Sequence, residues 1–188
     1  MQNTKINNPS KPRTWVIRAG RQGSAHDIFI KSSLVVLEHQ QLGDLRKLPK
    51  LRKSFCNAYA VHHPDDGIVS VRGIGGKFYR FVHEIRCGDI VLYPCFLDEN
   101  IYHGVIKGAY FYAVGSKADF PHCRRIQWKG CFPKNALSLH AKRELGAART
   151  LFEIKTNISE IKRVIHLRNG SQRRPEIHRQ QPLLHDAF

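Results

Sequence analysis

The stretch Gly88-Asp-Ile-Val-Leu-Tyr93 marks the point at which the chain changes from helical to β-strand patterns. Its apolar part has strand length and follows a Gly-Asp turn. Further short strands are predicted at 101–106, 109–114, 125–128 and 150–154, separated by turns with Gly, Pro, Asp or Asn. Several short strands around one small core favour a barrel, because closure removes exposed strand edges.

The chain before this point mixes strands and helices. A strand is predicted from Thr14 to Arg18, ended by Ala19-Gly20, and another over 33–37, followed by a turn at Gly43-Asp44. Between them, Ser24 is predicted to cap a short helix that carries Ile28 and Phe29.

Apolar residues at helical spacing predict two longer helices, over 45–59 and 68–85. Gly73, Gly75 and Gly76 weaken the second pattern and do not match a phosphate-binding loop, since Phe78 follows Lys77 where the Walker pattern needs Ser or Thr. We interpret these glycines as a closely packed or flexible helix turn. The predicted fold class is therefore α+β, a small β-barrel flanked by helices.

The charge of the chain points to a polyanionic partner. Lysine and arginine total 31 against 15 acidic residues, a net charge of +16, and the densest basic cluster is 46–53. Hydrophobic residues make up 41 %, which is enough to form a folded core. A solvated helix face without a partner is the alternative explanation of the cluster.

We expect one domain over 14–165, a flexible leader over 1–13 and a basic tail or linker over 166–188, which would join the domain to another segment. No apolar run is long enough for a membrane span or shaped as a secretory signal, so a cytoplasmic protein without a membrane partner is expected. The odd number of cysteines and the absence of a Cys-x-x-Cys pair favour reduced thiols.

Two kinds of metal chemistry remain as alternatives to a protein without cofactors. Zinc would require convergence of a scattered set: His83, Cys87, Cys95, His122, Cys123 and Cys131. A metal-dependent nuclease would use Glu153 and Lys155, with Asp119 or Asp89 as a further ligand. A Glu-x-Lys pattern is common on ordinary strands, and no nucleophile motif accompanies the histidines, so we expect a binding module more than an enzyme.

Aromatic and basic side chains alternate along much of the chain. The rings are Trp15, Phe78, Tyr79, Phe81, Tyr93, Tyr102, Tyr110, Phe111, Tyr112 and Trp128, and the interleaved cations are Arg18, Arg21, Arg80, Lys107, Arg124, Arg125 and Lys129. Proteins that bind a base outside the stack need rings to sandwich the base and cations to hold phosphates. Many of these rings would also serve as ordinary core residues.

The order of the motifs resembles the N-terminal domain of Mrr-type restriction endonucleases, which is similar to EVE and PUA-like barrels. The resemblance covers about residues 14–155. It is carried by Thr14-Trp-Val-Ile-Arg-Ala-Gly20, Leu42-Gly-Asp-Leu45, Tyr79-Arg-Phe-Val-His-Glu-Ile85, Gly88-Asp-Ile-Val-Leu92, and Phe120-Pro-His122 before Ile126-Gln-Trp128. It implies a reader of modified DNA in bacterial defence that works with a separate nuclease domain or subunit. Many relatives have Gly-Trp where this chain has Glu38-His39, so the expected aromatic wall of the pocket is either missing or replaced by an imidazole.

The expected site therefore has two parts. The base pocket is predicted to consist of Trp15, Arg18, Gly20, His39, Asp44, Tyr79, Phe81 and Trp128. The phosphate-binding residues are predicted to be Arg21, Arg46, Lys47, Lys50, Arg52, Lys53, Arg80, Arg124 and Arg125. The expected ligand is DNA with a flipped, modified base, and the alternatives are an RNA-binding PUA-like module and the nuclease described above.

Overall fold

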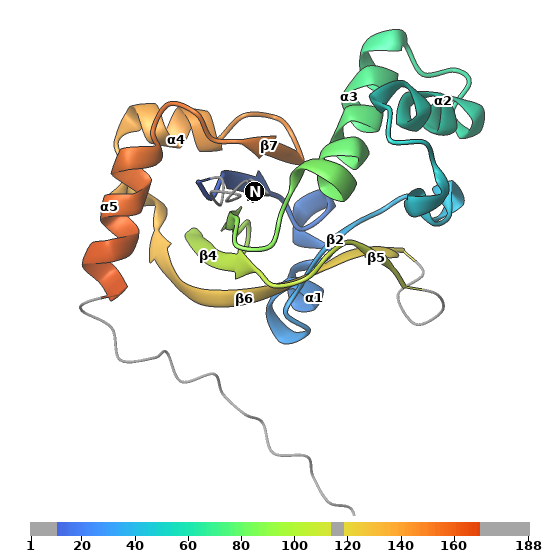
Figure 1. The fold of residues 1–188 in the computed structure, drawn as a ribbon. Helices are drawn as coiled ribbons and strands as arrows, with labels where there is room; N and C mark the ends of the chain where they lie inside the picture. The colour runs from blue at the N-terminus through green and yellow to red at the C-terminus, as the bar shows by residue number, and fades with distance from the viewer. Residues whose placement is uncertain (1–10, 114–118, 170–188) are drawn as a thin grey trace, which may run out of the picture.

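The computed structural model describes residues 11–113 and 119–169 (Figure 1). The strands of this part are β1 (Thr14–Ile17), β2 (Leu34–Leu37), β3 (Ile90–Pro94), β4 (Asn100–Ile106), β5 (Phe111–Tyr112), β6 (His122–Pro133) and β7 (Leu151–Glu153). The helices are α1 (His26–Lys31), α2 (Arg52–His62), α3 (Ile68–Tyr79), α4 (Leu139–Leu145) and α5 (Ile158–Asn169). Short 3-10 turns lie at Arg21–Gly23, Gln40–Leu42, Leu45–Lys47 and Lys134–Ala136, and a π-helical turn, Arg80–Glu84, continues α3.

The strands form one curled sheet, which has the shape of a half-barrel (Figure 1). Its order is β2-β6-β4-β3-β1-β7, and β5 pairs with β6 beside this path. The long strand β6 pairs antiparallel with β2 along one part and with β4 along the other. The register of the β4–β6 pair shifts between His103 and Gly104 of β4. The predicted α+β class is confirmed, but β2 and β7 lie at opposite ends of the described path, so these strands do not form a closed barrel.

Strand β1 lies between two hydrophobic cores. Trp15 and Ile17 point into the larger core, and Val16 points into the smaller one, because successive side chains of a strand alternate between its faces. This two-sided burial explains why β1 is continuously apolar. Trp15 Nε1 donates to Asp89 Oδ2 at 2.8 Å, so the Gly-Asp turn before β3 fixes the indole of β1.

Helices α2 and α3 pack against each other and project beyond the sheet, at the upper right of Figure 1. A Cβ added to Gly75 of α3 would lie 2.6 Å from the backbone Cα of Cys56 in α2, whereas one added to Gly73 would meet no atom within 4 Å. The interpretation of these glycines as a closely packed helix turn thus holds at Gly75.

The predicted helix over 45–59 is interrupted in the structure. A 3-10 turn ends at Lys47, Pro49 follows it, and α2 begins only at Arg52, because proline lacks the N–H that a helix interior needs. The predicted cap of α1 is also wrong. Ala25 occupies the N-cap position, and no side chain bonds there.

Helices α4 and α5 were not predicted, and they cover the smaller core at the left of Figure 1. Helix α5 continues to Asn169, so the ordered structure passes the predicted domain end at 165. The predicted strand over 125–128 is part of the longer β6, and the strand predicted over 109–114 is short. Residues 1–10 of the leader, residue 114 and the tail beyond 169 lie outside the described residues. In the described part, every helix is too short or too polar to cross a bilayer.

Candidate nucleic-acid interface

The basic segment, residues 46–53, is exposed at each of its cations. Asp44 caps the turn by accepting from the backbone N–H of Arg46 and also forms an ion pair with the Arg46 guanidinium at 2.6 Å. This hydrogen bonding lowers the pKa of Asp44. In the described part of the chain, Lys47, Lys50 and Lys53 have no such acidic partner. These three lysines therefore present positive charge that no acidic side chain of the described residues neutralises.

The end of this segment coincides with the N-terminus of α2, where the helix dipole is already positive. Leu51 occupies the N-cap position without a side-chain hydrogen bond, and the first turn contains no acidic residue. Arg52 and Lys53 instead add two cations to this turn. Each such charge destabilises a helix by about 0.3–1 kcal/mol at low salt. The arrangement is unfavourable for folding alone and favourable for binding an anion.

A second group of cations lies around Arg80, in the π-helical turn after α3. Burial lowers the pKa of the Arg80 guanidinium, and the nearby charges of Arg52 and Arg149 lower it further, while Glu84 opposes them. The Arg52 guanidinium lies directly against Gly76, in the space that a Cβ would occupy. Arginines from α2, from the π-helical turn after α3 and from the approach to β7 thus converge. We call Arg52, Arg80 and Arg149 the arginine cluster.

His39 has a left-handed backbone, with φ 78° and ψ 61°, directly after β2. His122 holds this conformation from β6: its Nε2 lies 3.1 Å from the His39 carbonyl oxygen, and its Nδ1 lies 2.9 Å from the Tyr110 hydroxyl. The carbonyl can only accept, so Nε2 carries the proton and Nδ1 accepts from Tyr110. Burial lowers the pKa of His122 to about 4, which keeps it neutral at pH 7. Residues with strained backbone conformations cluster at functional sites, so His39 is a candidate for one.

The imidazole of His39 packs against side chains from α2, from the residue that follows α2, and from α3. Tyr59, His63 and Phe78 meet it edge-on, with ring centroids 5.4–5.6 Å away. The Gln41 amide lies 3.3 Å from His39 Nδ1 and 2.9 Å from His63 Nε2. Burial lowers the pKa of His39, and so does the charge of Lys77. We call His39, Gln41 and His63 the histidine site.

Lys77 reaches the same region from α3. Its side chain is only 9 % exposed, and its Nζ lies 2.8 Å from Glu38 Oε1. Burial alone would raise the pKa of Glu38, but the Lys77 ammonium lowers it below its ordinary value. Glu38, which replaces the glycine expected from the resemblance, therefore supplies the counter-ion of a buried lysine and ties β2 to α3.

Three predicted site residues are sealed inside the protein. Trp15 and Phe81 have no exposed surface and belong to the larger core. Arg124 is 2 % exposed, and its guanidinium donates to the carbonyl oxygens of Phe81, Val82 and Gly108 at 2.6–3.1 Å. Two of these bonds satisfy carbonyls of the π-helical turn, and the third satisfies one between β4 and β5. The two rings and this cation are structural here and do not face a ligand.

The other predicted base-pocket residues lie in separate surroundings. Arg18 donates to the carbonyl oxygens of Leu145, Ala147 and Arg149 near the end of α4. Trp128 Nε1 donates to the Phe29 carbonyl oxygen at 2.6 Å, and Asp44 is paired with Arg46. The ring of Tyr79 packs against Phe55 and His83. Gly20 lies beside Ser24 and Phe120. The structure therefore leaves His39 as the centre of any base site. Arg21 and Arg125 are exposed and stay predicted phosphate contacts.

Neither metal site gains support. No group of three or more His, Cys, Asp or Glu side chains within residues 11–113 and 119–169 is arranged to hold a metal ion. Glu153 forms an ion pair with Arg13 at 2.6 Å, which lowers its pKa and occupies the carboxylate that a nuclease would need.

Several residues beside the predicted site residues were not predicted from the sequence to take part in the site. Arg149, Gln41, His63 and Lys77 come from segments without a strong motif, and only their fold brings them beside predicted residues. Lys77 carried one usable signal, because it lies on the apolar side of the α3 pattern next to Phe78.

The fold and the site define an α+β protein with a half-barrel sheet and a group of cations around the N-terminus of α2. We call the basic segment together with the arginine cluster the cationic face. The chain belongs to the family described as Domain of unknown function (DUF8426). The family model matches residues 15–155 of the 188-residue chain. No curated protein matches the chain.

Proposed function

We propose that this protein is a nucleic-acid-binding module, with DNA as the first candidate ligand, that grips the phosphate backbone with the basic segment and the arginine cluster. The observation that carries the proposal is a group of exposed cations before and at the N-terminus of α2, where the cap makes no side-chain hydrogen bond. Among the described residues, Lys47, Lys50, Arg52 and Lys53 have no acidic partner. Like charges brought together in this way cost folding free energy, and a bound polyanion removes that cost.

The finer proposal is a reader that holds one unstacked base at the histidine site. Gln41 and the two imidazoles offer hydrogen-bonding edges, and the buried rings of Tyr59 and Phe78 hold the His39 imidazole in place. Proteins that bind a base outside the duplex use such polar edges to recognise it. The resemblance to Mrr-type and PUA-like domains supports modified DNA as the ligand and a nuclease domain or subunit as the partner.

Fluorescence anisotropy with labelled 20-base-pair duplexes tests the proposal. Duplexes with plain and modified cytosine, and an RNA of the same sequence, are each titrated across a salt series. A phosphate grip predicts affinity that falls steeply with salt, and a reader predicts tighter binding of one modified duplex at every salt concentration. Equal affinity for all duplexes would refute base recognition while leaving the backbone grip intact. Preference for the RNA would favour the PUA-like alternative.

Two variants separate the parts of the interface. His39→Ala should abolish the preference for modified DNA and change the salt dependence little, because His39 carries no phosphate contact in this proposal. Lys53→Gln should weaken all duplexes alike and reduce the salt slope by about 1. Lys155→Gln, an exposed lysine just after β7 with no ion pair among the described residues, is the matched control, and an equal effect there would contradict the assignment.

A further inference from the structure

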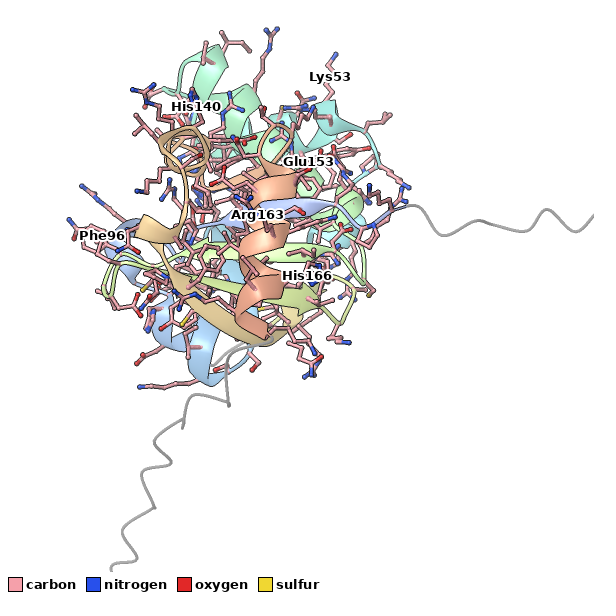
Figure 2. All side chains as sticks on the ribbon, turned by 90° about the vertical axis from the view of Figure 1, so that its left-hand side faces the viewer. Lys53, Phe96, His140, Glu153, Arg163 and His166 are labelled. Atoms are coloured by element: carbon pink, nitrogen blue, oxygen red, sulfur yellow. The ribbon has the colours of Figure 1, made fainter. Side chains whose placement is uncertain are left out.

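A cavity of about 220 Å³ lies apart from the basic segment, where the end of β1 meets the β3–β4 hairpin and α4. Its inner wall is apolar and buried, with Cys95, Ile101 and Leu145 each at most 3 % exposed. Phe96 also lines the cavity and is itself 66 % exposed. Figure 2 shows Phe96 at the edge of the molecule, separate from the region of Lys53.

The charged residues that line this cavity are all basic: Arg18, Lys134 and Lys142. Lys134 shares its charge with Glu99 at 3.0 Å, whereas Lys142 has no acidic partner among the described residues. An apolar wall with two or three cations at the opening is the pattern of a site for a small organic anion.

The position of Arg18 shows that the site is already formed. Two of its nitrogens are held by carbonyl oxygens near the end of α4, with Nη2 at 3.1 Å from Leu145 and 2.9 Å from Ala147. These bonds neutralise the carbonyl end of α4, which would otherwise repel an anion. The Nη1 group has no hydrogen bond to the described residues, so the guanidinium has donor capacity left for a ligand.

We propose that this cavity binds a small carboxylate with a compact apolar body, placing the carboxylate against Arg18 and Lys142 and the apolar body against Ile101 and Leu145. The volume sets the size of the ligand. A cavity of about 150 Å³ accommodates benzene, so 220 Å³ accommodates one ring with its carboxylate. This inference does not depend on the proposed nucleic-acid function, since no residue of the basic segment lines the cavity.

Benzoate is the probe that tests the inference, titrated into ¹⁵N-labelled full-length protein and followed by amide chemical shifts. We expect saturable shifts at 94–97 and 142–146, no saturable shifts with the neutral isostere benzamide, and weaker binding of inorganic phosphate. Equal binding of benzamide would overturn the role of the cations, and equal binding of phosphate would overturn the role of the apolar wall. Absence of saturation with benzoate would overturn the site itself.

A pair of variants on α4 provides the residue-level test. Lys142→Gln should weaken benzoate about tenfold, because a hydrogen bond to a charged group is lost. Arg143→Gln, its exposed neighbour outside the cavity lining, should leave the affinity unchanged. Both side chains are exposed, so both variants should fold, and equal losses in the two would contradict the proposed carboxylate position.

Discussion

Removing four cations of the basic segment should weaken DNA binding without weakening the fold. The substitutions are Lys47→Gln, Lys50→Gln, Arg52→Gln and Lys53→Gln. If each cation meets one phosphate, the slope of log K against log salt should become less steep by about 3.6, or about 0.9 for each contact. If the two proteins bind equally at about 1 M salt, the affinity of the variant at about 0.1 M should be lower by roughly 4,000-fold.

The same variant makes an opposite prediction for stability. Two of the substituted charges lie in the first turn of α2, where each costs about 0.3–1 kcal/mol, so the free energy of unfolding should stay equal or rise. Fluorescence anisotropy across a salt series and urea unfolding measure the two effects. The control removes the same charge elsewhere: Lys31→Gln, Lys129→Gln, Lys155→Gln and Arg163→Gln. An unchanged slope in the first variant, or an equal loss in the control, would refute the reasoning.

Three further predictions concern the structure that holds the interface. The pKa of His122 is lowered from 6.5 to about 4, so the unfolded chain takes up a proton there at higher pH than the folded protein does. The free energy of unfolding should therefore keep its full value above pH 6.5 and fall by about 3 kcal/mol toward pH 4. Urea unfolding across this pH range should show a smaller loss in His122→Gln. Gly75→Ala should destabilise by about 1–3 kcal/mol by pushing α2 away, whereas Gly73→Ala, with open space, should stabilise by about 0.5–1 kcal/mol, and thermal melting of the two tests this. Arg124→Met should cost about 3 kcal/mol or more by leaving buried carbonyls unbonded, and an equal cost in its exposed neighbour Arg125→Met would contradict that structural role.

The strands were predictable from the sequence where both faces of the sheet are covered. β1, β2 and β3 are short apolar runs because nearly every side chain in them is buried. α4 was missed because its seven residues bury only Ala141 and Leu145, too few to show a period. α5 does bury Ile161 and Ile165 at helical spacing, but its polar C-terminal end resembles the tail that follows.

Of the candidate site, only the exposed cations were predictable from the sequence. Exposed cations of the basic segment follow directly from composition, since a lysine is rarely buried without a partner. Aromatic residues gave no such guidance, because the same ring types fill the core and the surface, and Trp15 and Phe81 proved to be core. The histidine site depends on contacts between β2, α2 and α3 that no local pattern encodes.

Chemical-shift mapping of the ¹⁵N-labelled protein with a short DNA duplex tests most directly where a nucleic acid binds. We predict that the largest amide shifts fall at residues 46–56 and 76–84, and that they diminish as salt is added. Shifts confined to α1 and α5, or shifts that do not respond to salt, would contradict the cationic face as the binding surface.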